Sequence, residues 1–74
     1  MEKEKFNIKF GEYIRQIRRD KGLTQMDIAS LVGVNPQNIS ALERGKFAPT
    51  LYWIDHFCNV LDLDKKTFFN SFYS

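Results

Sequence analysis

The most constraining feature of this sequence is the stretch LTQMDIASLVGVNPQNISALERG, which covers residues 23–45. It contains two short helical patterns, one beginning at Thr24 and one at Asn35, with Gly33 between them. A glycine at that point permits the positive φ of a tight turn, and Asn35 followed by Pro36 is a strong signal for the start of a helix. The stretch therefore predicts two helices joined by a tight turn.

The rest of the chain shows further helical patterns and no strand pattern. Apolar residues spaced by three and four predict a helix over about residues 9–21 and two more helices over about residues 50–73. Residues 1–8 are charged and poor in apolar side chains, so we expect a flexible arm. With the two helices of residues 24–44, the expected fold is all-α: a single domain of five short helices over residues 1–74.

The helix that begins at Pro36 is expected to turn one face to the core and the opposite face to solvent. With about 100° between successive residues, Ile39 and Leu42 define the buried direction. The residues on the opposite side are Gln37, Ser40, Ala41 and Arg44. Glutamine pairs with adenine through two hydrogen bonds, serine donates or accepts, and an alanine methyl suits the thymine methyl. Two helices with such an outward face predict a helix-turn-helix, which places its second helix in the major groove of DNA; the alternative is an ordinary solvent-facing surface.

The distribution of charge favours the same interpretation. A net charge of +2 does not by itself indicate a nucleic-acid partner. Residues 1–46, however, carry nine Lys or Arg against six Asp or Glu, whereas residues 47–74 carry two against three. The basic surplus therefore lies in the part of the chain that contains the predicted helix-turn-helix.

Little in the sequence points to catalysis. Cys58 is the only cysteine, which excludes an intrachain disulfide and a Cys/His zinc cluster. His56 stands two positions before it on a predicted helix, so the two side chains do not face each other. No phosphate-binding loop, carboxylate pair or long apolar segment occurs. We expect no enzyme, no metal or other cofactor, no small-molecule ligand and no membrane contact, and a reducing cytoplasm fits the single cysteine.

Residues 18–63 resemble a known family of proteins. The motifs KGLTQ and ISALERG, the pair Ala29 and Gly33, and the proline that follows are all in register with the phage repressor and Cro-like helix-turn-helix family, also called the XRE family. The resemblance implies a compact lambda-repressor-like fold that binds double-stranded DNA in the prokaryotic nucleoid. Restriction-modification controller proteins, a branch of this family, have a similar length and a short fifth helix with paired aromatics like Phe68 and Phe69.

The resemblance also implies a role for individual residues. Positions that usually touch bases are Asn35, Pro36, Gln37, Ser40 and Ala41. Positions that contact the DNA backbone are Arg18, Thr24, Gln25, Asn38, Arg44 and Lys46. Arg18 and Glu43 match an ion pair that braces the first helix against the end of the recognition helix, and Gln25 matches a residue that also braces it. Pro36 departs from the family because it has no polar group and no N–H, so a base contact there is lost or apolar.

The two helices expected over residues 50–73 carry more apolar side chains than a small core needs. In the first of them, the helical spacing predicts a buried face made of Leu51, Ile54, Phe57, Cys58 and Leu61. The residues left over, which we predict to form a homodimer interface, are Tyr52, Trp53, His56, Val60, Phe69, Phe72 and Tyr73. A two-fold dimer would place two recognition helices about one turn of DNA apart on a pseudo-palindromic operator. The alternative is that these rings only cap the core.

The predicted function is therefore that of a sequence-specific transcription regulator, with autoregulatory control of a restriction-modification system as one specific role. A DNA-binding antitoxin and a phage or mobile-element repressor remain open as alternatives. A role of another class is a protein-docking module that uses the helix-turn-helix without DNA. Salt separates the last of these from the others, because binding through DNA phosphates weakens steeply as salt rises.

Overall fold

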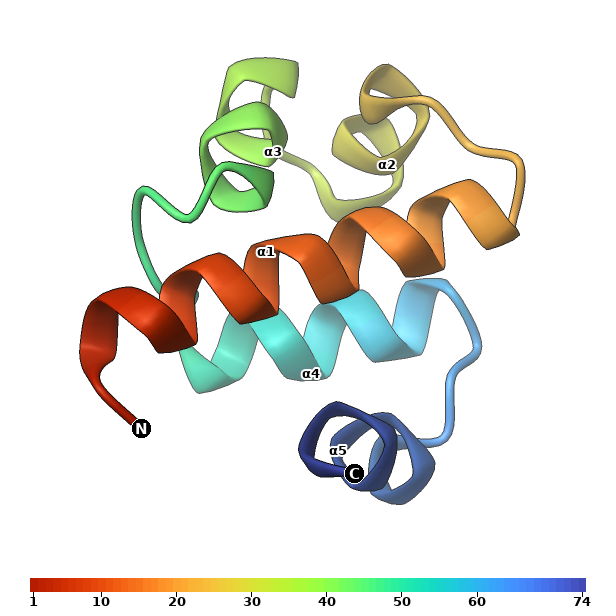
Figure 1. Ribbon diagram of the computed structural model, residues 1–74. Coiled ribbons are helices and arrows are strands. Elements are labelled where there is room, and N and C mark those ends of the chain that lie inside the picture. The colour runs from red at the N-terminus through yellow and green to blue at the C-terminus, as the bar shows by residue number, and fades with distance from the viewer.

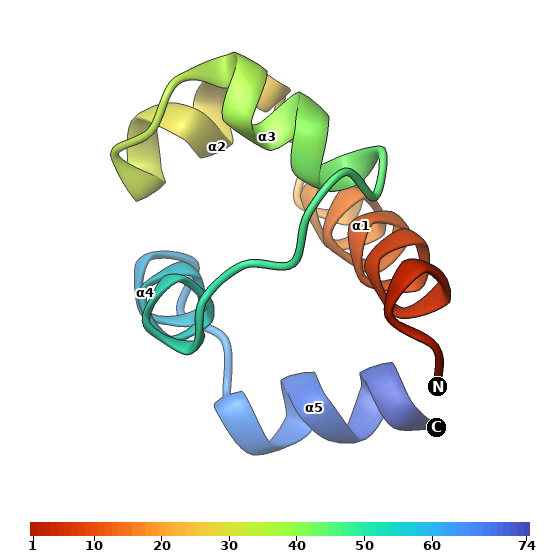
Figure 2. The same ribbon diagram turned by 90° about the vertical axis from the view of Figure 1, so that its left-hand side faces the viewer.

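The computed structural model describes residues 1–74 and consists of five α-helices without a strand, which confirms the all-α prediction. The helices are α1 (Lys3–Asp20), α2 (Gln25–Val32), α3 (Pro36–Glu43), α4 (Leu51–Val60) and α5 (Lys65–Tyr73). In both views α2 and α3 lie above α1 and α4, and α5 lies below them (Figure 1 and Figure 2). None of the five helices is long and apolar enough to span a membrane.

Side-chain caps determine where four of the helices begin. The Thr24 hydroxyl accepts a hydrogen bond from the Asp27 N–H, and the Asp27 carboxylate accepts one from the Thr24 N–H, so a complete capping box forms. Asn35, Thr50 and Asp64 each accept a hydrogen bond from the backbone N–H three residues later. The starts of α2 and α3 agree with those predicted from Thr24 and Asn35, and α4 begins next to residue 50, where the range predicted for the last two helices begins.

The turn between α2 and α3 depends on Gly33. This residue has a φ of 86°, and its N–H donates to the Ala29 carbonyl at 2.9 Å. The N–H of Val34 donates to the same carbonyl at 2.9 Å, and its side chain packs against the core. Local hydrogen bonds and one apolar anchor thus fix the direction in which α3 leaves α2.

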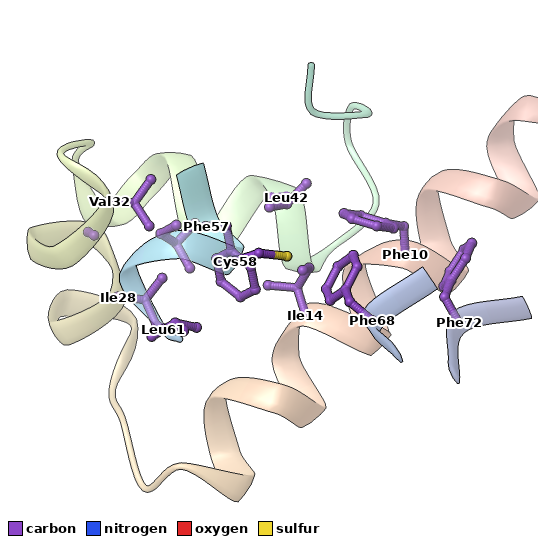
Figure 3. Close-up of a cluster of buried hydrophobic side chains, with 12 residues drawn as sticks. Phe10, Ile14, Ile28, Val32, Leu42, Phe57, Cys58, Leu61, Phe68 and Phe72 are labelled. Carbon is purple, nitrogen blue, oxygen red and sulfur yellow. The ribbon is translucent and has the colours of Figure 1, made fainter. Parts of the chain in front are cut away.

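A single hydrophobic core joins the five helices (Figure 3). Its twelve buried members are Phe10, Ile14, Ile28, Ala29, Val32, Ile39, Leu42, Phe57, Cys58, Leu61, Phe68 and Phe72. Cys58 lies within this cluster, and burial raises the pKa of its thiol. Cys58 is accordingly an uncharged packing residue of α4, and it is not activated as a nucleophile.

The prediction of a flexible arm over residues 1–8 is wrong, because α1 already begins at Lys3. Phe6 stacks on Phe10 with 5.9 Å between ring centroids and meets Phe72 edge-on at 5.4 Å. The first turns of α1 are thus held by α5, from the other end of the chain. The charged sequence of this segment does not reveal a contact with a partner so distant in sequence.

Part of the predicted homodimer interface belongs to the core instead. Phe72 is only 2% exposed, so its assignment to an interface is wrong. Trp53 stacks on Phe57 with 5.1 Å between ring centroids, and Trp53, Val60 and Phe69 are partly buried against the core. The packing of Trp53, Phe69 and Phe72 on the core explains much of the apparent aromatic surplus.

Other residues of α4 and α5 remain at the surface. Tyr52 is 78% exposed and Tyr73 is 63% exposed, and Tyr52 stacks on the partly exposed His56 with 6.2 Å between ring centroids. Leu51 was predicted to be buried, but it is 75% exposed. No other helix covers Leu51, which instead borders an open hollow between α4 and α5.

Candidate nucleic-acid interface

The outward face of α3 is oriented as the helical spacing predicts. Ile39 and Leu42 are fully buried. The four residues predicted on the opposite side are all partly or fully exposed: Gln37, Ser40, Ala41 and Arg44. Asn35 caps the helix and Pro36 occupies its first turn, so the position of this face is fixed from its first residue.

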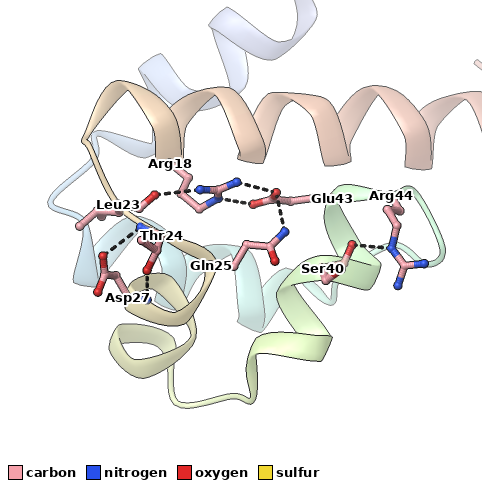
Figure 4. Close-up of polar contacts among 8 residues, drawn as sticks. All are labelled: Arg18, Leu23, Thr24, Gln25, Asp27, Ser40, Glu43 and Arg44. Atoms are coloured by element: carbon pink, nitrogen blue, oxygen red, sulfur yellow. Dashed lines mark hydrogen bonds and ion pairs between the residues drawn. The ribbon is translucent and has the colours of Figure 1, made fainter.

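An ion pair between Arg18 and Glu43 holds α3 against α1 (Figure 4). Arg18 Nε and Nη2 donate to the two carboxylate oxygens of Glu43 at 2.7 and 3.1 Å, and Nη1 donates to the Leu23 carbonyl at 2.8 Å. The side chains are only 12% and 3% exposed, respectively. The hydrogen bond with Glu43 raises the pKa of Arg18 above its usual value, although burial opposes the increase. The structure thus contains the bracing pair predicted from the family resemblance.

Gln25 connects the first turn of α2 to the same carboxylate. Its amide Nε2 donates to Glu43 Oε1 at 3.2 Å (Figure 4). Glu43 therefore accepts hydrogen bonds from both α1 and α2 at the end of α3. Arg18 uses three of its five N–H donors within the protein, which leaves two for any other contact.

A close crossing of α1 and α3 occurs at Gly11. A Cβ atom added there would lie 2.7 Å from the Glu43 carbonyl oxygen and still nearer to that of Leu42. Both neighbours are backbone atoms, so they cannot move aside as a flexible side chain does. Gly11 is not among the residues predicted to matter for the site. A glycine between Phe10 and Ile14 on an apolar helix face was the available signal.

The other predicted DNA contacts differ in how freely their side chains can reach a ligand. Thr24 and Lys46 are exposed, although the Thr24 hydroxyl is engaged in its cap. Asn35 is exposed but its side-chain oxygen caps the Asn38 N–H at 2.9 Å. Asn38 is partly buried, and its side-chain oxygen has no hydrogen-bond partner. Pro36 is partly exposed and offers only an apolar ring.

Comparison with known sequences identifies related regulators. A family model described as a helix-turn-helix domain matches residues 9–67. An uncharacterized HTH-type transcriptional regulator from Methanothermobacter thermautotrophicus is 50% identical over 38 residues, which is 51% of this chain and 55% of that protein. The uncharacterized HTH-type transcriptional regulator y4dJ from Sinorhizobium fredii is 42% identical over 41 residues, covering 55% and 53% of the two chains. The chain thus spans about half the length of the curated relatives it matches.

Two solved structures share the fold over most of the chain. The clp gene regulator ClgR from C. glutamicum has a TM-score of 0.80 and 25% identity, covering 90% of this chain and 87% of that one. The restriction-modification controller protein C.AhdI from Aeromonas hydrophila has a TM-score of 0.75 and 31% identity, covering 82% and 92%. Because the family model spans most of the chain and these structures superpose on it, the chain belongs to the helix-turn-helix domain family and is an XRE-type helix-turn-helix protein.

Proposed function

We propose that this protein is a sequence-specific transcription regulator that binds double-stranded DNA with the outward face of α3. The observation that carries this proposal is the exposed polar face of α3 on a helix whose end is anchored by a buried ion pair. A rigidly held helix with free polar side chains suits recognition in the major groove. The protein acts without catalysis, in the cytoplasm, where the DNA of a prokaryotic cell lies.

Within this face we assign base contacts to Gln37, Ser40 and Ala41, whose side chains form no hydrogen bond within the protein that DNA binding would have to break. Pro36 can offer only an apolar contact. We assign backbone contacts to Arg44 and Lys46, which are exposed and form no ion pair, and to Gln25, whose amide Nε2 keeps one N–H beyond its bond to Glu43. We place Arg18 with the bracing residues, because three of its N–H groups are already satisfied within the protein.

Substitutions of Gln37 and Arg44 test these assignments. Gln37→Ala is expected to cost about 1–3 kcal/mol at one base pair of each half-site, because it removes a two-bond base contact. Arg44→Ala is expected to weaken binding to all sequences equally and to reduce the slope of log K against log salt by about 0.9 per protomer. Fluorescence anisotropy with specific and random duplexes over a salt series measures both effects.

Two outcomes would contradict the proposal. Equal losses on specific and random DNA for Gln37→Ala would remove Gln37 as a base reader. If the unsubstituted protein fails to bind any duplex at low salt, the protein-docking alternative is favoured and the DNA-binding function is wrong.

We further propose that the protein acts as a homodimer through α4 and α5. Support comes from the exposed Leu51, Tyr52 and Tyr73, which are large apolar or aromatic side chains. Between the two helices lies a hollow of about 380 Å³ lined by Leu51, Tyr52, Ile54, Asp55, Lys65 and Phe69. Four of the six residues that line this hollow are hydrophobic, and in a two-fold dimer the same surface of each copy faces that of the other.

Sedimentation tests the dimer without DNA. We expect a dimer at tens of micromolar for the unsubstituted protein and a monomer for Tyr52→Asp, because a carboxylate cannot be buried in an apolar interface without a partner. Met26→Asp is a matched control, since Met26 is also an exposed apolar residue but lies on α2. A monomeric unsubstituted protein, or a Tyr52→Asp variant that remains dimeric, would contradict this interface.

As the biological role we propose autoregulatory control of a restriction-modification system. The likeness to C.AhdI over 92% of that controller supports this role. Binding of the protein to DNA directly upstream of its own gene is the expected result of a footprinting experiment. The roles of antitoxin and phage repressor differ from this one in their neighbouring genes and partners, while sharing the α3 surface.

A further inference from the structure

A second charged feature lies beside the outward face of α3. It is a hollow of about 200 Å³ between α1, α2 and the end of α3, and none of its lining residues is hydrophobic. The lining residues are Arg15, Arg18, Gln25, Ser40, Glu43 and Arg44. Figure 4 shows all of these except Arg15, and the bonds that connect them. A hollow lined only by polar and charged groups, at the surface of a small domain, is suited to a polar ligand.

The charges in the hollow do not cancel. Glu43 is the only acid among the lining residues, and Arg18 and Gln25 already donate three hydrogen bonds to its carboxylate. The protein has only two ion pairs, Arg18–Glu43 and Lys65–Asp55, so Arg15 and Arg44 both carry unpaired charge. The hollow therefore presents two guanidinium groups without an ion-pair partner, and it favours an anion.

One of these cations is held in place by α3 itself. Arg44 Nε donates to the Ser40 carbonyl at 3.2 Å, which leaves both terminal nitrogens of its guanidinium free (Figure 4). A guanidinium whose terminal N–H groups are free matches the geometry of phosphate oxygens. Fixing it before the ligand arrives reduces the entropy lost on binding.

We propose that this hollow binds one phosphate group of the DNA backbone, and that Arg15 of α1, outside the helix-turn-helix, is a contact for it together with Arg44. Ser40 belongs both to the outward face of α3 and to the lining of the hollow. The backbone of a DNA strand whose bases contact α3 therefore lies next to the opening of the hollow. The contact fixes the register of α3 in the groove, because phosphate contacts position a protein on the duplex without reading sequence. This inference rests on the proposed DNA-binding function.

The test compares Arg15→Gln with Lys66→Gln. Both remove one positive charge from an exposed side chain, but Lys66 is on α5, at the opposite side of the molecule from α3 (Figure 1 and Figure 2). Arg15→Gln is expected to weaken binding to specific and random duplexes by the same factor and to lower the salt slope measurably, by less than the value of about 0.9 per protomer for a whole phosphate, because Arg44 still contacts the same phosphate. Lys66→Gln is expected to leave both unchanged. Equal melting temperatures of the two variants establish that both are folded.

Duplexes with single neutral methylphosphonates locate the contact. At one position in each half-site, neutralising the phosphate is expected to weaken binding by the unsubstituted protein and to weaken binding by Arg15→Gln less, because only Arg44 still contacts that phosphate in the variant. An unchanged salt slope for Arg15→Gln, while the unsubstituted protein binds DNA, overturns the inference and leaves the proposed function intact. A failure of the unsubstituted protein to bind DNA defeats the proposed function itself.

Inorganic phosphate distinguishes the DNA backbone from a free anion as the source of the ligand. One outcome is that millimolar inorganic phosphate raises the melting temperature of the unsubstituted protein but not that of Arg15→Gln, while Arg15→Gln keeps the full salt slope on DNA. In that case the hollow is a site for a free anion, and the assignment to DNA is wrong. No effect of inorganic phosphate at matched ionic strength, with a reduced slope for Arg15→Gln, supports the DNA phosphate.

Discussion

Glu43→Ala is expected to lower the free energy of unfolding by about 3–5 kcal/mol, because it removes one partner of a buried ion pair. Arg18 would then retain a charge in a position where its side chain is only 12% exposed. The Gln25 amide would also lose its acceptor. Urea unfolding followed by circular dichroism measures the change. Binding to DNA is expected to weaken as well, since the end of α3 loses its anchors on α1 and α2.

The double variant Arg18→Met/Glu43→Leu separates the ion pair from simple packing. Replacing both charges by apolar side chains avoids a buried unpaired charge, so it is expected to recover much of the stability lost in Glu43→Ala. Glu12→Ala is the control for loss of a carboxylate at an exposed position of α1, and a change within about 0.5 kcal/mol is expected there. A Glu43→Ala variant as stable as Glu12→Ala would contradict the bracing role.

The second large effect is expected from Gly11→Ala. At an ordinary position within a helix, this change stabilises a protein by about 0.5–1 kcal/mol. At Gly11 the added methyl would meet the carbonyl groups of Leu42 and Glu43, both part of the α3 backbone. We therefore expect a loss of about 2–3 kcal/mol from the forced separation of α1 and α3.

The sign of the change makes this a decisive experiment. Thermal or urea unfolding of Gly11→Ala showing a gain in stability would mean that α1 and α3 do not cross as closely as described. A loss accompanied by weaker DNA binding would show that the crossing also sets the position of α3.

The features that the sequence predicts well are local. The caps Thr24, Asn35, Thr50 and Asp64 each accept a hydrogen bond from a residue three positions later, so their signals are contained in a few letters of sequence. The outward face of α3 follows in the same way from helical spacing around Ile39. Both features depend on interactions within a few residues, so cap residues and helical periodicity are enough to predict them.

The features that were wrongly predicted depend on contacts between distant parts of the chain. The first turns of α1 pack on α5 through the contact of Phe6 with Phe72, and Phe72 is buried there. Leu51 follows the helical spacing of α4, but no helix covers it. Periodicity identifies a face of a helix and does not tell which part of that face another helix reaches.

The site was predicted in part from spacing and in part from family resemblance. Spacing selects Gln37 as an outward residue, whereas the pairing of Arg18 with Glu43 came from the resemblance, because the two residues are 25 positions apart. The resemblance implies that Arg18, Gln25 and Arg44 of the anion-binding hollow contact the DNA backbone, but neither route predicted Arg15. Arg15 lines the hollow only because α1 packs beside α3. Short-range sequence patterns do not predict how two helices pack.

Selection of bound duplexes from a random pool tests most directly whether α3 reads DNA sequence in a dimeric protein. We expect enrichment of two inverted half-sites whose centres lie about one helical turn apart, since a two-fold dimer presents two copies of α3. Repeating the selection with Gln37→Ala is expected to relax the preference at one base pair in each half-site. Base reading by the outward face of α3 would be contradicted if no sequence is enriched. It would also be contradicted if Gln37→Ala selects the same base at every position as the unsubstituted protein.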